Sequence, residues 1–239
     1  DRYALAMTRQ LQGELQAHYD AYEFHFIVQK LQSFCSEDLG GFYLDILKDR
    51  LYTTAPKSIA RRSAQSALWH IVQAFSKLMA PILSFTAEEV WQVLTGDAGQ
   101  SVMFQTWHDL PKPEDEGELL VRWSQIRGVR ADVTKALEAL REAGKIGSSL
   151  QAEVELQCTT EKYDLLASLG DDLKFVLICS KASLHKADAD ALLAQPSTHG
   201  KCERCWHVRE DVGSDSQYPT LCGRCVSNLY GSGEARTHA

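Results

Sequence analysis

The sequence lacks a long apolar run and a secretion signal. No part of its 239 residues approaches the roughly 20 apolar residues that a membrane-spanning helix needs, and no basic segment followed by an apolar one stands at its start. These absences predict a globular protein of the cytoplasm. An initiator methionine is also missing, and the chain opens at Asp1 within a helical pattern. We therefore expect it to be part of a longer protein.

The chain also has no excess of positive charge. Its formal net charge is −7, the wrong sign for a protein that binds nucleic acid with its whole surface, so such a role would depend on a local basic patch. Hydrophobic residues make up 44% of the chain and charged residues 24%, which is sufficient for an ordinary core. The length allows one main domain with one or two small appendages.

The cysteines number seven, so they cannot all pair with one another. Cys35, Cys158 and Cys179 are scattered through apolar segments, where cysteine behaves as a small core hydrophobe. The other four cluster near the end of the chain. Without a secretion signal, this distribution predicts a reducing compartment, with buried thiols and a metal site in place of disulfides.

Residues 1–95 have the apolar spacing of helices. Apolar side chains recur at i, i+3, i+4 and i+7 in Phe24–Cys35 and again in Ala64–Met79, which predicts two core-facing helices. Ser58 is the predicted N-cap of the second helix, and Pro81 is expected to end or kink it.

A further helix start is predicted shortly after that proline. Thr86 and Glu89 have the spacing of a capping box, and Phe85 and Val90 that of a hydrophobic staple. Gly96 is placed to end this helix. Several amphipathic helices joined by short breaks predict a helical bundle.

The apolar spacing changes in the second half of the chain. Residues 118–186 begin with a helical stripe, Leu119–Leu140, and continue with the alternation of a half-buried strand at Leu150–Cys158. The short apolar run Phe175–Cys179 predicts a partner strand. We therefore predict a small α+β unit, followed by a linker at 187–199, where the composition turns polar.

Two cysteine pairs near the end have the spacing of a zinc site. Cys202 and Cys205 are separated by two residues, as are Cys222 and Cys225, and sixteen residues lie between the pairs. Four thiolates at about 2.3 Å fill the zinc tetrahedron and leave no position for water, so the ion would be structural. The alternative of two redox-active pairs lacks the strand–helix context in which such pairs occur. His207 is a competing ligand.

Several segments match a known pattern, in order along the chain. They are Phe42–Tyr52, Ser58–Gln65, Met79–Trp91, Lys201–His207 and Leu221–Val226. The first three resemble the anticodon-binding helical domain of isoleucyl-tRNA synthetases, and the last two resemble that family's C-terminal zinc module. The resemblance implies a mainly α fold: a helical bundle of the class I synthetase anticodon-binding type, with a small α+β appendage and a zinc finger.

The resemblance also implies an activity for the whole protein, an ATP-dependent isoleucine–tRNA ligase that edits mischarged valine. Two nucleotide-binding signatures of that family, His-Ile-Gly-His and Lys-Met-Ser-Lys-Ser, are absent here, as is an editing domain. Lys145–Ser149 echoes the second signature, but it lies between a predicted helix and strand and is interpreted as a turn. The expected partner of this chain is tRNA(Ile), bound by a monomer without catalytic residues, and ATP would be used by a catalytic domain outside it.

An RNA-binding face is implied by the local charge. Between residues 48 and 77, six basic residues oppose Asp49 alone, a sum of +5. Basic side chains neutralise phosphates, and exposed aromatics stack on unpaired bases. The predicted tRNA contacts are Lys57, Arg61, Arg62, Arg204, Trp206 and Arg224. A solvated helix face is the alternative for the basic residues, and a small core filler is the alternative for Trp206.

The predicted parts are a bundle at 1–117, an α+β unit at 118–186, a linker at 187–199 and a zinc finger at 200–230. Two other functions stay open. Bacterial formamidopyrimidine-DNA glycosylases carry a similar four-cysteine finger and bind duplex DNA, and a zinc-stapled interaction module would bind no nucleic acid. The bundle and the finger together favour the synthetase family.

Overall fold

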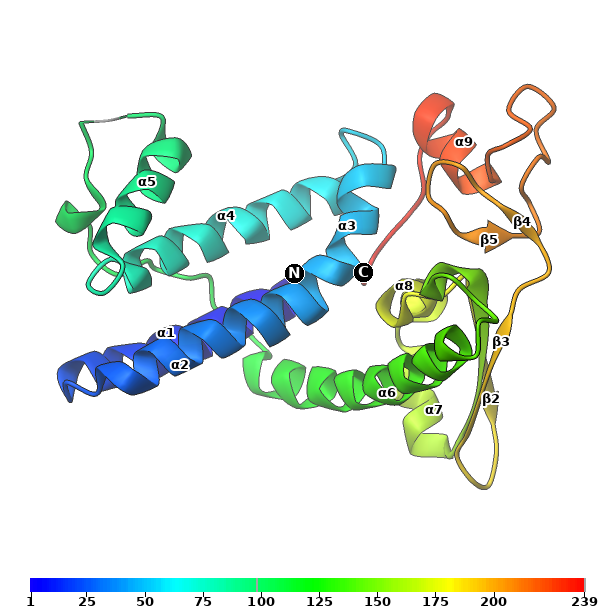
Figure 1. Ribbon diagram of the computed structural model, residues 1–239, viewed down its shortest axis with the longest axis horizontal. Coiled ribbons are helices and arrows are strands. Elements are labelled where there is room, and N and C mark those ends of the chain that lie inside the picture. The colour runs from blue at the N-terminus through cyan, green and yellow to red at the C-terminus, as the bar shows by residue number, and fades with distance from the viewer. Residues whose placement is uncertain (98, 239) are drawn as a thin grey trace. The chain divides into compact units, whose positions relative to one another are not determined.

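The computed structural model describes residues 1–97 and 99–238 (Figure 1). The chain divides into two compact units. Unit 1 comprises Asp1–Asp45 and Arg62–Leu120, and unit 2 comprises Ile46–Arg61 and Val121–Ala239. The chain passes between the units within helices, so each unit receives part of the same helix.

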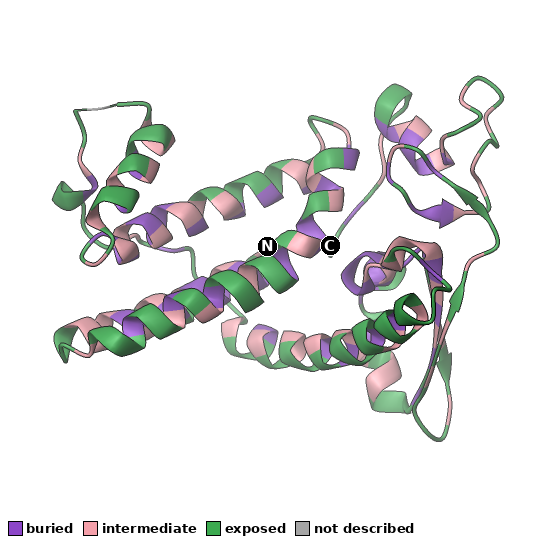
Figure 2. Ribbon diagram, in the orientation of Figure 1, coloured by how far each residue is buried: buried purple, intermediate pink, exposed green. Residues whose placement is uncertain are grey.

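Unit 1 is helical. Its elements are α1 (Arg2–Asp20), α2 (Phe24–Ser33), the π-helical stretch η1 (Phe34–Tyr43), the start of α3 (Leu44–Thr53), α4 (Ile59–Met79) from Arg62 onward, α5 (Ser84–Thr95), the 3-10 turn η2 (Val102–Phe104) and the start of α6 (Glu116–Glu142). Buried positions recur along one side of α1, α2 and α4, among them Leu15, Ile27 and Leu78 (Figure 2). Burying each such side chain contributes about 1.5–3 kcal/mol.

Three of the predicted helix ends are confirmed. The Arg61 N–H donates to Ser58 Oγ at 3.2 Å, the hydrogen bond of an N-cap at the start of α4. Helix α4 ends at Met79, before Pro81. Gly96 closes α5 in the left-handed conformation, with φ at 67°, as the predicted glycine stop requires.

The predicted capping box and staple of α5 are wrong. The helix begins at Ser84, ahead of Thr86, and Leu83 occupies the N-cap without a side-chain hydrogen bond. Phe85 is 89% exposed, so it forms no staple with Val90. The turn after α4 leads directly into α5. Thr86 therefore already lies inside the helix and does not cap it.

Cys35 was predicted to be a core residue and is instead exposed, whereas Cys158 and Cys179 are buried as predicted. From Phe34 onward the chain winds more widely, as the π-helical stretch η1. The 3.6-residue spacing on which the prediction depended no longer applies there, because a π-helical turn holds more residues.

Unit 2 contains a three-stranded sheet of order β2–β1–β3. Beyond most of α3, the start of α4 and the bulk of α6, its elements are η3 (Ser149–Gln151), β1 (Ala152–Cys158), α7 (Thr160–Ala167), η4 (Gly170–Asp172), α8 (Leu173–Leu177), β2 (Lys181–Lys186), β3 (Ala191–Pro196), β4 (Gly200–Lys201), β5 (Val208–Arg209) and α9 (Gly223–Tyr230). The central strand β1 alternates buried and less buried residues, as predicted. Val154 lies opposite Ala182 of parallel β2 and Ala194 of antiparallel β3.

The strand predicted at Phe175–Cys179 is wrong, because most of this run is the short helix α8. Ile178 ends that helix in the left-handed conformation. A short continuous apolar run is compatible with a buried helix as well as with a buried strand, and periodicity alone does not separate them. The parallel partner of β1 is the more polar segment that follows, β2.

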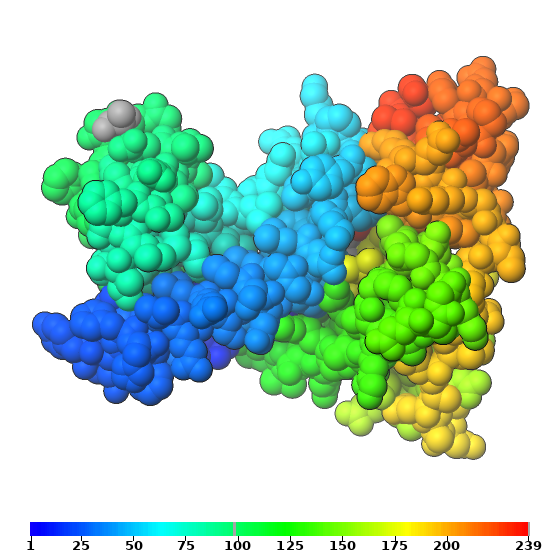
Figure 3. Space-filling view, viewed as in Figure 1, coloured from blue at the N-terminus to red at the C-terminus, as the bar shows by residue number. Residues whose placement is uncertain are grey.

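The polar stretch 187–199, predicted as a linker, contains β3, which pairs with β1 along its length. Its residues are half-buried or exposed, which is typical of an edge strand with one free side. In the space-filling view the segment that holds β2 and β3, yellow to orange, and the following segment, orange to red, form one continuous surface of unit 2 (Figure 3). Composition alone did not reveal a strand that is paired on one side.

The predicted fold class is confirmed. The chain is mainly helical, with a small sheet and a four-cysteine cluster near its end. No helix in the described ranges has both the length and the apolarity to cross a bilayer.

Candidate metal centre and nucleic-acid interface

The structure brings four cysteine sulfurs together. The Sγ atoms of Cys202, Cys205, Cys222 and Cys225 all lie within 4.8 Å of one another, and all four residues are buried. The Sγ atoms of Cys205 and Cys222 are 3.7 Å apart. A tetrahedral zinc ion with bonds of about 2.3 Å separates its sulfur ligands by about 3.8 Å. The donor set therefore fits one structural zinc ion, with no position left for a reacting water.

Local backbone geometry holds the two cysteine pairs in place. The Cys222 N–H donates to Cys202 Sγ at 3.4 Å, the kind of contact that stabilises a thiolate. Between the pairs, Gly213 has φ at 79°, and a Cβ there would lie 2.9 Å from the Pro219 carbonyl oxygen. This turn therefore requires glycine.

The thiols are too close together to ionise independently. Hydrogen bonds from Cys222 and Cys225 lower the pKa of Cys205 well below its usual range. The hydrogen bond to Cys205 in turn raises the pKa of Cys222 to about 12. Like charges at this distance repel, so only a bound dication allows all four sulfurs to be thiolates together.

His207 is not a member of the cluster. Within the described residues, the group that could hold a metal consists of the four cysteines. The buried imidazole of His207 donates from Nδ1 to the Cys205 carbonyl oxygen at 3.2 Å, and its ring packs edge-on against Phe175. The structure thus gives His207 a packing role beside the first cysteine pair, Cys202 and Cys205.

Arg224, a predicted tRNA contact, is buried. Its two terminal nitrogens donate to both carboxylate oxygens of Asp49, at 2.8 and 2.9 Å, and one of them also lies 3.3 Å from Glu234 Oε1. Although burial alone raises it, the hydrogen bonds from Arg224 and the charges of Arg224 and Arg236 lower the pKa of Asp49 to about 2. Arg224 is therefore enclosed within the protein and does not lie on the surface, where a tRNA contact is expected.

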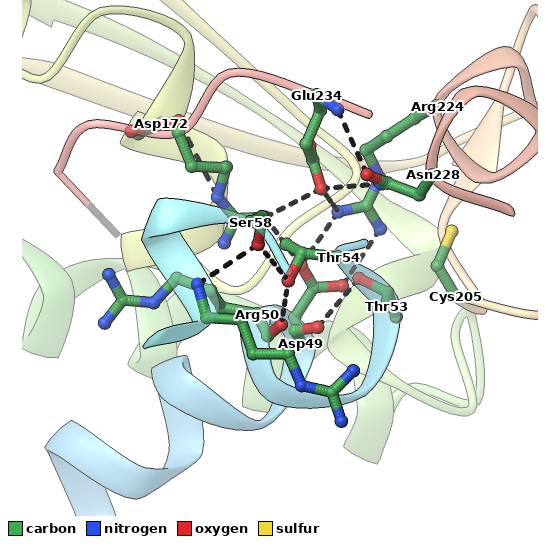
Figure 4. A network of polar contacts seen from close by, with 12 residues as sticks. Asp49, Arg50, Thr53, Thr54, Ser58, Asp172, Cys205, Arg224, Asn228 and Glu234 are labelled. Atoms are coloured by element: carbon green, nitrogen blue, oxygen red, sulfur yellow. Dashed lines mark hydrogen bonds and ion pairs between the residues drawn. The ribbon is translucent and has the colours of Figure 1, made fainter. Parts of the chain in front are cut away.

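Residues 234–238 form a strap at this ion pair. Arg236 Nη1 donates to Asp49 at 2.8 Å, and its guanidinium lies 3.5 Å from the centre of the Phe175 ring. The N–H groups of Thr237 and His238 both donate to Asp172 Oδ2, at 2.9 and 2.7 Å. The residues joined in this network include Asp49, Asp172, Arg224 and Glu234 (Figure 4).

Arg204, another predicted tRNA contact, is half-buried. Its guanidinium donates to the carbonyl oxygens of Thr53 at 2.6 Å and Tyr52 at 3.4 Å, and it also lies 3.6 Å from Cys225 Sγ. Its hydrogen-bonding groups are thus directed at the protein. No sequence signal pointed to Asp49, Asp172, Glu234 or Arg236, since acidic and basic residues of this kind occur throughout the chain.

The other predicted contacts lie at the surface. Lys57 and Arg62 are exposed and Arg61 is half-buried. The basic set between residues 48 and 77 is less uniform than its sequence indicates. Arg50 is only 6% exposed, and Lys77 packs over the Trp91 ring at 5.2 Å, so neither is an open phosphate contact.

Trp206 is exposed and strained. It follows Cys205 directly, has φ at 66° and is 62% exposed, and Lys201 Nζ lies 5.9 Å from its ring centre. A left-handed conformation costs a non-glycine residue about 1–2 kcal/mol, and such strain is a marker of functional positions. The alternative of a core filler for Trp206 is wrong, because the ring faces solvent.

A helical bundle and a four-thiolate finger in one chain define the class: a helical domain with a structural zinc module. Family comparisons match this division. The family described as the anticodon-binding domain of tRNA ligase matches residues 1–156, and the zinc finger found in FPG and IleRS matches residues 200–228. The chain therefore belongs to the anticodon-binding domain family of tRNA ligases.

The chain is similar along essentially all its length to isoleucine–tRNA ligases. It is 71% identical over 236 residues to that of Dechloromonas aromatica (99% of this chain, 25% of the relative). It is 65% identical over 239 residues to that of Thiobacillus denitrificans (100% and 26%) and 60% identical over 242 residues to that of Azoarcus sp. (100% and 26%). The chain spans about a quarter of the length of these curated relatives.

Proposed function

We propose that this chain is the tRNA-binding C-terminal part of an ATP-dependent isoleucine–tRNA ligase, with tRNA(Ile) as its partner. The observation that carries the proposal is the occurrence in one chain of an anticodon-binding domain and a finger of the type found in these enzymes. Isoleucine–tRNA ligases are also its relatives over its full length.

The chemical steps belong to other parts of such an enzyme. The sequence has neither of the two nucleotide-binding signatures of the family and no editing domain. We expect the chain alone to be inactive in both activation and editing. Isoleucine and valine differ by one methylene, worth about 1–3 kcal/mol in a pocket. Choosing the correct tRNA is a separate problem, and this chain would serve it.

We assign the zinc ion to Cys202, Cys205, Cys222 and Cys225. Four buried sulfurs that all lie within 4.8 Å of one another support this assignment. The ion would be structural, since a four-thiolate shell has no open position. The chain's own residues would hold the finger closed around it.

The RNA contacts that we propose are Lys57, Arg61, Arg62 and Trp206. The basic side chains would neutralise phosphates, and the exposed indole would stack on an unpaired base. Arg204 and Arg224, whose guanidinium groups hydrogen-bond within the protein, are not in this set.

Binding of an anticodon stem-loop at several salt concentrations tests the proposal. We expect Lys57→Ala/Arg61→Ala to weaken binding and to reduce the slope of log affinity against log salt by about 2, about one for each lost phosphate contact. Lys135→Ala, at an exposed position of α6, is the matched control and should leave both unchanged. Wild-type affinity and slope in the double variant would contradict this RNA face.

The same assay separates the alternatives. A finger used as in a DNA-repair enzyme would prefer a duplex with an abasic site to the RNA stem-loop. A zinc-stapled interaction module would bind RNA weakly and without salt dependence. We expect a preference for RNA that falls steeply as salt rises.

A further inference from the structure

The two zinc knuckles share a feature beyond their cysteines. Each has an arginine immediately before its second cysteine: Arg204 before Cys205 and Arg224 before Cys225. The guanidinium groups of both arginines hydrogen-bond to helix α3, on the part of the helix that belongs to the same compact unit, and that of Arg204 also lies 3.6 Å from Cys225 Sγ. This coincidence indicates a common role.

Arg204 caps the C-terminus of α3. The last carbonyl groups of a helix have no partner within it and carry partial negative charge, so a cation there is favourable. The Arg204 guanidinium accordingly donates to the carbonyl oxygens of Tyr52 and Thr53, at the final residues of α3. A residue from one zinc knuckle thus completes the end of a helix 151 positions earlier in the sequence.

Arg224 binds the same helix one turn earlier, at Asp49. Its bidentate pair with Asp49 is almost fully enclosed, with side-chain exposure of 6% for Arg224 and 16% for Asp49. A paired arginine–carboxylate fork fixes orientation as well as distance. Arg236 of the C-terminal strap binds the same carboxylate, so two cations from the end of the chain converge on α3.

A series of hydrogen bonds continues from this end of α3 into α4. Thr54 Oγ1 donates to the Arg50 carbonyl oxygen at 2.6 Å, and Ser58 Oγ donates to Thr54 Oγ1 at 3.2 Å. Ser58 Oγ in turn accepts from the Arg61 N–H. The turn held in this way carries Lys57, and it leads into the first turn of α4, which carries Arg61; both are proposed RNA contacts.

We propose that Arg204 and Arg224 are positioning residues through which the zinc site sets the conformation of the α3–α4 turn and its basic side chains. The metal fixes the backbone on which both arginines stand, and the arginines fix the end of α3. The last step, from turn to RNA, depends on the proposed function. The coupling between finger and turn does not.

The first test is amide hydrogen exchange of residues 54–61 in the zinc-loaded chain. We expect Arg204→Ala and Asp49→Asn to increase exchange there about tenfold or more, because local opening controls exchange. Arg209→Ala is the matched control: this finger arginine pairs with Asp211 of the same finger and should leave residues 54–61 unchanged. Cobalt-substituted samples should keep the absorption of a four-thiolate site in every variant.

Unchanged exchange at 54–61 in both Arg204→Ala and Asp49→Asn, with cobalt bound, would overturn the coupling. Arg224→Lys keeps the charge but loses the two-pronged contact. An intermediate increase in exchange in Arg224→Lys supports the two-pronged contact as the cause. This milder variant also keeps the test usable if a more disruptive variant fails to fold.

The second test uses the sign of the charge change. Asp49→Asn makes the chain more positive, so it should strengthen RNA binding if Arg224 contacts RNA directly. If Arg224 acts through the turn, the same variant should weaken stem-loop binding several-fold at constant salt. Unweakened binding in Asp49→Asn, beside weakened binding in Lys57→Ala/Arg61→Ala, would overturn the positioning role alone. Unweakened binding in the latter variant would instead count against the proposed function.

Discussion

The sheet and the zinc finger of unit 2 are stabilised by different means. Strand β1 buries Ala152, Val154, Leu156 and Cys158, so the sheet has an ordinary apolar interior. Among the described residues, the hydrophobic cluster around the metal site of the finger consists of the four cysteines, with Val212 and Leu221 partly buried against them. The finger therefore depends on a metal and on buried ion pairs where the sheet depends on apolar side chains.

This difference shows how strongly the finger relies on its surroundings. Arg224 and Arg236 place two cations around Asp49, and burial makes such groups costly unless each is paired. Removing one partner should therefore destabilise the finger, the strap and the end of α3 together. Removing an apolar residue from the sheet should destabilise the sheet alone.

Removal of zinc should have the largest effect. Zinc binding supplies about 10–16 kcal/mol in isolated zinc-finger peptides. A strong chelator, or Cys222→Ser, should therefore abolish protection from hydrogen exchange in residues 200–230 while strand β1 and helix α6 keep theirs. Metal analysis should give one zinc per chain before chelation. A finger that stays protected after complete removal of the metal would contradict the comparison.

Asp49→Asn should have the next largest effect. Removing one partner of a buried ion pair costs about 3–5 kcal/mol. The strap at residues 234–238 should therefore lose its protection from hydrogen exchange, while the strands of the sheet keep theirs.

The same carboxyl has a pH signature. Its pKa is lowered to about 2, against about 3.9 for an unperturbed aspartate. The stability it contributes is fully present above about pH 4 and is lost as the pH falls toward 2. Carbon NMR of the Asp49 carboxyl should show no titration above about pH 3. A midpoint near 4 would mean that the ion pair does not form.

Leu156→Ala should destabilise the sheet and spare the metal site. Leu156 is 4% exposed in β1, and truncating a buried leucine costs about 2–5 kcal/mol. Denaturant unfolding should show the loss, and zinc content should stay at one per chain. Loss of zinc from this variant would indicate that the two regions are not stabilised separately.

Trp206→Gly should have the smallest effect on stability, and a favourable one. Glycine adopts the left-handed conformation of this position without strain, which is worth about 1 kcal/mol. Resistance of the finger to chelator should rise slightly, while stem-loop binding should fall because the stacking surface is lost. A rise in both chelator resistance and stem-loop affinity would show that the exposed ring has no role in binding.

Much of the helical fold and the metal cluster could be predicted from sequence, because the signals are local. The cap at Ser58, the stop at Gly96 and the alternation of β1 all depend on neighbours within a few residues. The four-cysteine spacing likewise specifies its chemistry. The run at 175–179 could not be assigned in this way, since a short apolar run has no period that separates helix from strand.

The contacts between segments far apart in the sequence could not be predicted from the sequence. Nothing near Asp49 in the sequence indicates that Arg224 and Arg236 bind it. The sequence therefore indicated that Arg204 and Arg224 were surface cations, whereas both bind the end of α3. The only available signal was that each knuckle carries an arginine in the same place.

Binding of tRNA(Ile) to the zinc-loaded and the zinc-stripped chain, at one fixed salt concentration, tests the central claim most directly. If the metal-held finger and the basic turn form one RNA-binding surface, stripping zinc should weaken binding about tenfold or more, equivalent to about 1.4 kcal/mol. Readdition of zinc should restore it. Equal affinity with and without the metal would contradict the account.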